Sequence, residues 1–290
     1  MCLKNQRAEY GKRIVSTVVL QLEKEFGRSF NEKNVRRMMR FADVFDDFEI
    51  IAPAVRQLSW SHFLLLLPMK NIDAQLYNAK KAIEESLSRR ELQKQIELKA
   101  YERQEIANIQ VSLGMPELHN TFKDPYFLDF LGLKDGYLEK DLETAIVKEL
   151  EGFILELGKG FTFVERQKRI TLDGKDFYLD LLFFHRKLKR LVAIELKLRD
   201  FKPADKGQME LYLKWLDRYD RQEGENSPIG LILCAGRSTE QIELLGMHKD
   251  GTMVAEYWTE LPPKNVLEKK LHSLMIEVRA RLENRKMLEE

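Results

Sequence analysis

The chain has little of what marks a secreted, membrane or strongly basic protein. Its 290 residues include only two cysteines, Cys2 and Cys234, which excludes a disulfide framework and fits a reducing compartment. The longest apolar run, Phe63–Pro68, is far too short to cross a bilayer, and Met1–Asn5 lacks the pattern of a signal peptide. We therefore expect a soluble, cytoplasmic protein without a membrane partner.

Net charge is also nearly absent. The 48 basic and 47 acidic residues leave a formal charge of +1, so a site for a polyanion must be a local patch. The length suits one large or two modest domains, and a hydrophobic content of 44% is enough for a sizeable core.

Two apolar segments near the middle of the chain carry charges where a strand would bury apolar side chains. Phe177–Phe184 contains Asp180, and Leu191–Leu198 contains Glu195 and Lys197. Acidic residues are depleted in strands, and an unpaired buried charge is costly. A divalent cation between carboxylates would offset that cost, so we expect a metal site here.

The register of these two strands decides whether the acids meet. The connection at 185–190 is short enough for an antiparallel hairpin. If Phe184 pairs with Leu191, Asp180 lies opposite Glu195, with Cβ atoms roughly 4.5–5.5 Å apart. Carboxylates at that distance repel unless a proton or cation lies between them. A slip by one residue would put them on opposite faces.

The pattern of apolar residues divides the chain into two parts. Helical spacing dominates residues 1–118, which predicts an all-α N-terminal domain. Breakers and turn formers collect in residues 119–138, which we interpret as a linker. From residue 139 to 290 the expected order is helix, three strands, helix, strand, with a charged C-terminal helix. We expect the first of these helices to run unbroken from Glu139 to Leu157.

The acids and the segments around them resemble a known family. Asp180 followed by Glu195-x-Lys197, on the second and third strands of an αβββαβ order, resembles the PD-(D/E)XK nuclease superfamily. Longer strings resemble the YhcG-type nucleases over nearly the whole chain: Leu58–His62, Asp124–Phe127, Phe161–Gln167, Asp176–His185, Ala193–Lys197, Lys206–Met209 and Tyr212–Trp215. The resemblance implies an α/β, restriction-endonuclease-like domain with a mixed sheet.

The same resemblance implies metal-dependent hydrolysis of phosphodiester bonds, with DNA as the expected substrate. Asp180 and Glu195 would hold Mg²⁺ or Mn²⁺, and Ile194 or Leu196 would add a backbone carbonyl. Lys197 would position water and phosphate, because the nearby carboxylates oppose the lowered pKa that a lysine base needs. The alternative is a buried structural ion pair of this lysine with either acid.

Further residues are expected to support the site. Glu143 lies on the apolar stripe of its helix, and the resemblance implies an acidic metal ligand from that helix. Glu149 is its rival. Gln208 and Tyr212 lie one helical turn apart, and the resemblance implies a glutamine beside Lys197. Ordinary packing or solvent exposure is the alternative reading of these residues.

Two basic clusters are candidates for contact with nucleic acid. In the N-terminal part, a helix after Gly27–Phe30 is basic, which fits a DNA-reading helix-turn-helix and equally fits a structural hairpin or a dimerisation module. Solvated charge is the alternative for the cluster in the second domain. The candidates are Arg166, Gln167, Lys168, Arg169 and Tyr212 in the second domain, and Arg36, Arg37 and Arg40 in the first.

Two other functions compete with DNA cleavage. One is a nucleic-acid-binding or assembly protein whose nuclease domain no longer cuts. Intact Asp180, Glu195 and Lys197 argue against it, because a decayed site usually loses one such residue. The other is RNA cleavage, because the catalytic core does not distinguish sugars. A nuclease that cuts two strands often works as a dimer, so we expect a homodimer.

Overall fold

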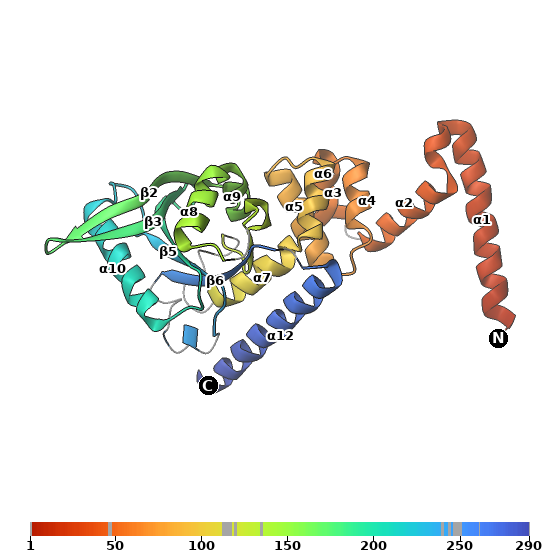
Figure 1. Ribbon diagram of the computed structural model, residues 1–290. Coiled ribbons are helices and arrows are strands. Elements are labelled where there is room, and N and C mark those ends of the chain that lie inside the picture. The colour runs from red at the N-terminus through yellow and green to blue at the C-terminus, as the bar shows by residue number, and fades with distance from the viewer. Residues whose placement is uncertain are drawn as a thin grey trace. The chain divides into compact units, whose positions relative to one another are not determined.

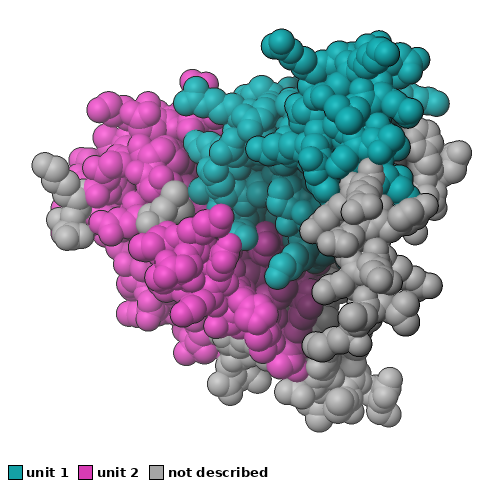
Figure 2. All heavy atoms as spheres, turned by 90° about the vertical axis from the view of Figure 1, so that its right-hand side faces the viewer, with its two compact units in different colours: residues 1–101 teal, residues 102–290 magenta. Residues whose placement is uncertain are grey.

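The computed structural model divides the chain into two compact units, Met1–Tyr101 and Glu102–Glu290. Figure 1 shows the elements of each unit, and Figure 2 colours the first unit teal and the second magenta. No helix among the described residues is long and apolar enough to cross a membrane. The structure describes residues 2–45, 48–111, 118, 121–133, 136–238, 241–242, 245, 251–260 and 262–289.

The described part of unit 1 is built from helices joined by short turns. Asn31 caps α2 by accepting the N–H of Asn34, and Ser88 with Glu91 forms a capping box at the start of α6. A core that includes the buried Phe63, Leu66 and Leu92 holds the later helices together. The helices are α1 (Cys2–Phe26), α2 (Glu32–Val44), α3 (Phe48–Gln57), α4 (Trp60–Leu66), α5 (Ile72–Glu84) and α6 (Arg89–Glu97), with a 3₁₀ turn, η1 (Arg28–Phe30), after α1.

Unit 2 is a six-stranded mixed sheet with helices on both faces (Figure 1). The strand order is β1-β6-β5-β4-β3-β2, with antiparallel β2–β3 and β3–β4 pairs and parallel pairs elsewhere. The strands are β1 (Tyr126–Phe127), β2 (Phe161–Leu172), β3 (Lys175–His185), β4 (Arg190–Lys197), β5 (Ile229–Cys234) and β6 (Thr252–Trp258). The helices are α7 (Ala100–Val111), α8 (Glu139–Lys148), α9 (Leu150–Leu157), α10 (Pro203–Tyr219) and α12 (Lys264–Glu289), with a 3₁₀ turn, η3 (Asp129–Leu131), before α8.

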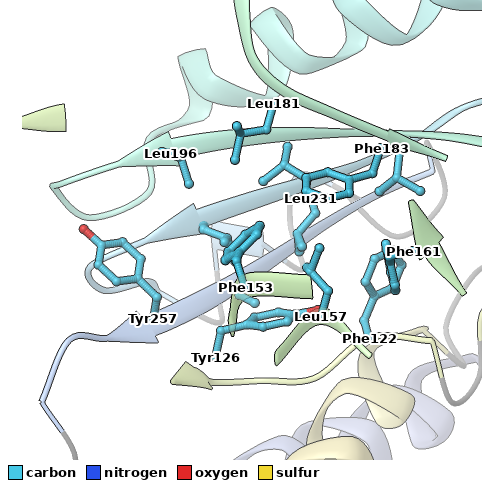
Figure 3. Close-up of a cluster of buried hydrophobic side chains, with 14 of the residues drawn as sticks. Phe122, Tyr126, Phe153, Leu157, Phe161, Leu181, Phe183, Leu196, Leu231 and Tyr257 are labelled. Atoms are coloured by element: carbon cyan, nitrogen blue, oxygen red, sulfur yellow. The ribbon is translucent and has the colours of Figure 1, made fainter. Parts of the chain in front are cut away.

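Two apolar clusters lie on the two faces of the sheet. On one face, α8 and α9 cover strands β3, β4 and β5, and Figure 3 shows Phe153 and Leu157 of α9 beside Leu181 and Phe183 of β3. On the other face, α10 contributes a cluster that contains Met209, Tyr212 and Leu216, together with residues of the same three strands. The expected order of helix, three strands, helix and strand is confirmed.

The described part of the segment 119–138, residues 121–133 and 136–138, is not a linker. Phe122, Tyr126 and Leu128 are buried in the core of unit 2, and β1 pairs in parallel with β6 through Tyr126 and Tyr257. The strand spans only Tyr126–Phe127, too few residues to show alternation among the surrounding turn formers. The boundary between the units also lies earlier than expected, because α7 belongs mainly to unit 2.

The helix expected from Glu139 to Leu157 is broken in two. The backbone leaves helical geometry at Glu149, which ends α8 and precedes α9. The buried residues Leu142, Ile146, Phe153 and Leu157 keep helical spacing across this break. The pattern of apolar residues therefore gave no sign of the break between α8 and α9.

Candidate active site

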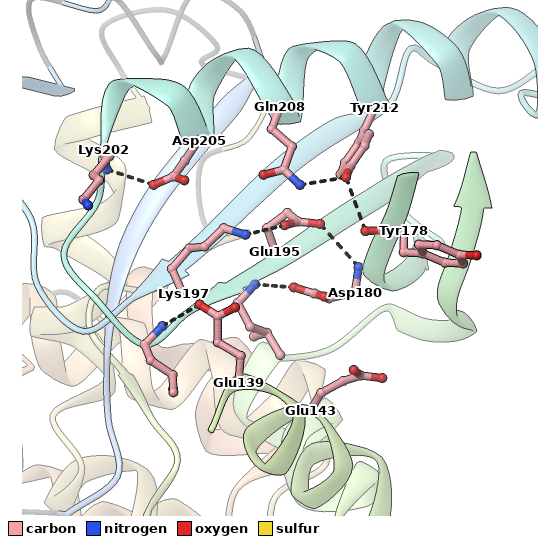
Figure 4. Close-up of polar contacts among 12 residues, drawn as sticks. Glu139, Glu143, Tyr178, Asp180, Glu195, Lys197, Lys202, Asp205, Gln208 and Tyr212 are labelled. Carbon is pink, nitrogen blue, oxygen red and sulfur yellow. Dashed lines mark hydrogen bonds and ion pairs between the residues drawn. The ribbon is translucent and has the colours of Figure 1, made fainter. Parts of the chain in front are cut away.

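The hairpin of β3 and β4 brings the two strand acids together. The expected pairing of Phe184 with Leu191 is confirmed. The backbone N–H of Asp180 donates to Glu195 Oε1 at 3.3 Å, and the N–H of Leu196 donates to Asp180 Oδ2 at 2.9 Å (Figure 4). Each carboxylate is therefore fixed by the backbone of the opposite strand.

The side chains on either side of Asp180 do not keep strict alternation. Leu181 packs on the α8–α9 side and Leu182 on the α10 side, as alternation requires. Leu179 should then lie with Leu181, yet it belongs to the cluster on the α10 side. The faces of the strand that pack on the two clusters therefore differ before and after Asp180.

Glu195 and Lys197 form a buried ion pair. The ammonium lies 2.8 Å from Glu195 Oε2, and Glu195 is only 2% exposed. Burial, followed by the charge of Asp180, raises the pKa of Glu195 to about 7, although Lys197 opposes the shift. Burial lowers the pKa of Lys197, but the surrounding acids, Glu195 first among them, together outweigh it and hold that pKa above its ordinary value. The lysine therefore stays charged at neutral pH.

A third carboxylate, Glu143 of α8, reaches this cluster through an amide. Gln167 Nε2 donates to Glu143 Oε2 at 2.7 Å and to Asp180 Oδ1 at 3.2 Å. Burial raises the pKa of Asp180, and burial followed by the charge of Asp180 raises the pKa of Glu143. The rival, Glu149, is exposed at the break between α8 and α9.

Glu139 is a residue of the site that the sequence analysis missed. Its Oε1 accepts the backbone N–H of Leu198 at 3.3 Å. Burial lowers the pKa of Lys197, and the charge of Glu139 is among those that oppose this shift; burial raises the pKa of Asp180, and the charge of Glu139 adds to it. Glu139 lies one helical turn before Glu143, so the two acids share one face of α8. The spacing of one helical turn from Glu143 was the sequence signal that could have identified Glu139.

On the opposite side of the site, α10 presents Gln208 and Tyr212. Gln208 Nε2 donates to the Tyr212 hydroxyl at 2.7 Å, and that hydroxyl donates to the carbonyl of Tyr178 at 3.3 Å. Figure 4 shows both side chains pointing from α10 toward the strands, Gln208 toward Glu195 and Tyr212 toward Tyr178. Burial raises the pKa of Tyr212, so it stays a neutral hydrogen-bonding group.

The candidate phosphate-binding cations mostly have acidic or polar partners. Lys168 lies 3.1 Å from Glu165 and 3.3 Å from Asp220, and Arg169 lies 2.8 Å from Asp176. Arg166 is exposed at the edge of the site. On α2 of unit 1, Arg36 pairs with Glu32, Arg37 donates to Asn34, and Arg40 is exposed.

The chemistry of the acids fits a hard divalent cation. Among the residues that the structure describes, no three His, Cys, Asp or Glu side chains form a ready-made cluster. Mg²⁺ needs no such cage, because it is commonly bound by one or two carboxylates, with water and phosphate as further ligands. Asp180 and Glu195 supply such a pair, and burial raises the pKa of both, with the charge of Asp180 adding to the shift at Glu195.

Comparison with solved structures gave partial matches only. A repair endonuclease from Pyrococcus abyssi is 22% identical, with a TM-score of 0.30 over 45% of this chain and 50% of that one. A complex of EndoMS with dsDNA is 21% identical, with a TM-score of 0.28 over 41% of this chain and 45% of that one. This chain thus spans half or less of those structures.

Sequence comparison gave matches along nearly the whole chain. The model described as the YhcG PDDEXK nuclease domain matches residues 119–272, and the model described as the DUF1016 N-terminal domain matches residues 1–103. The Escherichia coli strain K12 protein named "Putative nuclease YhcG" is 32% identical over 316 residues, which covers 96% of this chain and 83% of that protein. With its mixed sheet and paired strand acids, the chain belongs to the YhcG family of PDDEXK nucleases.

Proposed function

We propose that this protein is a cation-dependent nuclease that hydrolyses phosphodiester bonds of DNA at Asp180, Glu195 and Lys197. The observation that carries the proposal is the geometry of these three groups. Two carboxylates are fixed on adjacent strands, and a lysine ammonium lies 2.8 Å from one of them. Family membership supports nuclease activity.

The balance of charge favours a cation over a purely structural ion pair. Asp180, Glu143 and Glu139 lie around the Glu195–Lys197 pair, so the acids outnumber the lysine. The pKa of each of Asp180, Glu143 and Glu195 is raised by burial, and the last two are raised further by Asp180. If Glu195 and Lys197 formed only a structural ion pair, the negative charge of the other acids would stay uncompensated.

Each residue then has a role set by its position. Asp180 and Glu195 would hold Mg²⁺ or Mn²⁺, with Glu143 as the third acidic ligand. When bound, the cation would neutralise charge that develops on phosphate and make water more acidic. Lys197, kept charged by Glu195, would attract the phosphate and orient the attacking water. Gln208 and Tyr212 would support the site from α10.

The wider assignments are also proposals. DNA would contact the basic residues of β2, and the arginines of α2 would either read DNA or lie in a dimer contact. We expect a homodimer and a cytoplasmic location. Light scattering of the purified protein measures the oligomeric state, and a monomer at micromolar concentration would contradict the dimer.

Incubation of the purified protein with a panel of substrates tests the proposed function. The panel comprises supercoiled plasmid, linear duplex, single-stranded DNA and RNA, each with Mg²⁺, Mn²⁺ or EDTA. We expect cleavage of DNA with either cation and none with EDTA. Cleavage of RNA alone would show that the substrate is RNA and not DNA. Salt-dependent binding without cleavage would favour a binding module, and cleavage in EDTA would overturn the mechanism.

A further inference from the structure

Gln167 of β2 joins two carboxylates that come from different elements. Its single amide nitrogen donates to Glu143 Oε2 of α8 at 2.7 Å and to Asp180 Oδ1 of β3 at 3.2 Å. An amide NH₂ has two N–H donors, so it serves one carboxylate with each. The sequence predicted that Gln167 contacts nucleic acid, whereas its amide donates to these two acids.

The backbone of Gln167 is unusual for a residue inside a strand. Its φ is +48°, in the left-handed region, where a side chain with a Cβ is strained. The other described non-glycine residues with positive φ, among them Asp173 and Lys189, lie in turns. Because β2 is paired with β3 on both sides of Gln167, no turn accounts for its conformation.

The strained backbone of Gln167 therefore goes together with the position of its side-chain amide between Glu143 and Asp180. Glu143 and Asp180 repel, since the charge of Asp180 adds to burial in raising the pKa of Glu143. The amide separates the two groups and offers a donor to each without adding a net charge. A lysine or arginine there would compete with a cation for the same oxygens, whereas a neutral amide leaves the negative charge available.

We propose that Gln167 is a positioning residue that holds Glu143 beside Asp180 and so makes Glu143 available as a cation ligand. Its left-handed backbone aims the amide between the two acids. This inference rests on the proposed cation site, but the contact among the three side chains does not need a cation to exist. It can therefore be tested with and without metal.

Two substitutions separate the reach of the amide from the backbone strain. Gln167→Asn keeps an amide and tolerates the left-handed region, but its side chain is shorter by one methylene. Gln167→Gly removes both the amide and the strain. Lys189→Gly is the matched control, because it relieves the same kind of backbone conformation in the turn between β3 and β4.

The first measurement is the affinity for Mn²⁺ by titration calorimetry. Outer residues that orient metal ligands typically contribute about tenfold or more to affinity. We expect Gln167→Asn and Gln167→Gly each to bind Mn²⁺ about tenfold more weakly than wild type, and Lys189→Gly to bind it as wild type does. If wild type binds Mn²⁺ and both Gln167 variants match it within twofold, the inference is wrong while the cation site stands.

The second measurement is a double-mutant cycle in EDTA between Gln167→Ala and Glu143→Ala, followed by urea unfolding. We expect coupling, so that the double variant differs from the sum of the single variants. Additive effects would mean that the amide does not hold Glu143 and would overturn the inference. Coupling in EDTA together with no Mn²⁺ binding by wild type would instead overturn the proposed cation site.

Discussion

Asp180 and Glu195 are fixed by each other's strands, with the N–H of Asp180 donating to Glu195 Oε1 at 3.3 Å. The reciprocal contact, from the N–H of Leu196 to Asp180 Oδ2, measures 2.9 Å. The carboxylates are thus held close together by the backbone of one hairpin, and they cannot easily relax apart. Burial raises the affinity of both carboxylates for protons, and the charge of Asp180 adds to this effect at Glu195. A cation between the two carboxylates would relieve the same repulsion.

The first prediction concerns stability against pH in metal-free protein. The pKa of Glu195 is about 7 in the folded state against an ordinary value of 4.5, so the folded state binds this proton more tightly. The free energy of unfolding should therefore fall as pH rises from about 5 to 8, by on the order of 3 kcal/mol. Urea unfolding in EDTA across this range measures the slope.

The matched variant for this prediction is Glu195→Gln, which cannot titrate. Its slope between pH 5 and 8 should be much smaller than that of wild type. Mn²⁺ should restore stability to wild type at pH 8, because a bound cation stabilises the folded state. Equal slopes in wild type and variant would show that Glu195 does not titrate near neutrality.

The second prediction distinguishes the role of Lys197 from the role of the bound cation. Lys197→Met removes the ammonium that we assign to phosphate and water, and loss of one such group typically costs about 10²–10³-fold in rate. Cation affinity at pH 8 should not fall, because Glu195 loses its competing positive partner. Cleavage rates and Mn²⁺ titrations on the same samples measure both quantities. A variant that cuts at the wild-type rate would remove Lys197 from the mechanism.

The third prediction concerns the role of α7 in the nuclease unit. Arg103 of α7 is buried, donates to the carbonyl of Pro125 and pairs with the buried Glu156 of α9, to which Lys123 also donates. Removal of one partner from a buried ion pair typically costs about 3–5 kcal/mol. A chain of residues 100–290 should therefore unfold cooperatively, whereas residues 119–290 should be far less stable.

A pair of point variants checks that the ion pair causes this difference. Arg103→Met should lower the melting temperature, because Glu156 loses one of its two buried cations. Glu156→Leu should lower it more, because Arg103 and Lys123 then both lose their buried acid. A 119–290 fragment as stable as 100–290 would contradict the assignment of α7 to this unit.

The fourth prediction concerns the close approach of α10 to the sheet, which places Gln208 and Tyr212. A Cβ on Gly230 of β5 would lie 2.6 Å from Met209 Cγ and Sδ. Gly230→Ala should therefore destabilise the protein by about 1–3 kcal/mol. Gly207→Ala on α10 is the control: its Cβ would meet nothing within 4 Å, so it should be neutral or stabilising in urea unfolding. Equal effects of the two changes would contradict the packing.

The sequence was most informative where a local rule sets the geometry. Asp180 and Glu195 were placed together because a short hairpin and the alternation of strand side chains determine the register. The segment 119–138 was wrongly predicted to be a linker. Its strand, β1, is held by pairing with β6, which lies far away in the sequence. No local pattern reports such a contact.

Two residues of the site show a further limit of sequence reasoning. The position of Gln167 depends on a left-handed backbone and on a contact with Glu143 across 24 positions. Neither is encoded in a short-range pattern, so the phosphate role was the natural expectation. Glu139 was visible as a helical neighbour of Glu143, but only the fold shows that it meets the end of β4 at Leu198.

The most direct test of the central claim is plasmid cleavage by Asp180→Asn beside Asp176→Asn, each with Mg²⁺ and with EDTA. Asp176 lies on the same strand, but its partners are Arg169 and Thr171, outside the carboxylate cluster. We predict that wild type and Asp176→Asn cut plasmid with Mg²⁺ and not with EDTA, while Asp180→Asn cuts at least about 100-fold more slowly. Cleavage by Asp180→Asn at the rate of Asp176→Asn would contradict the account.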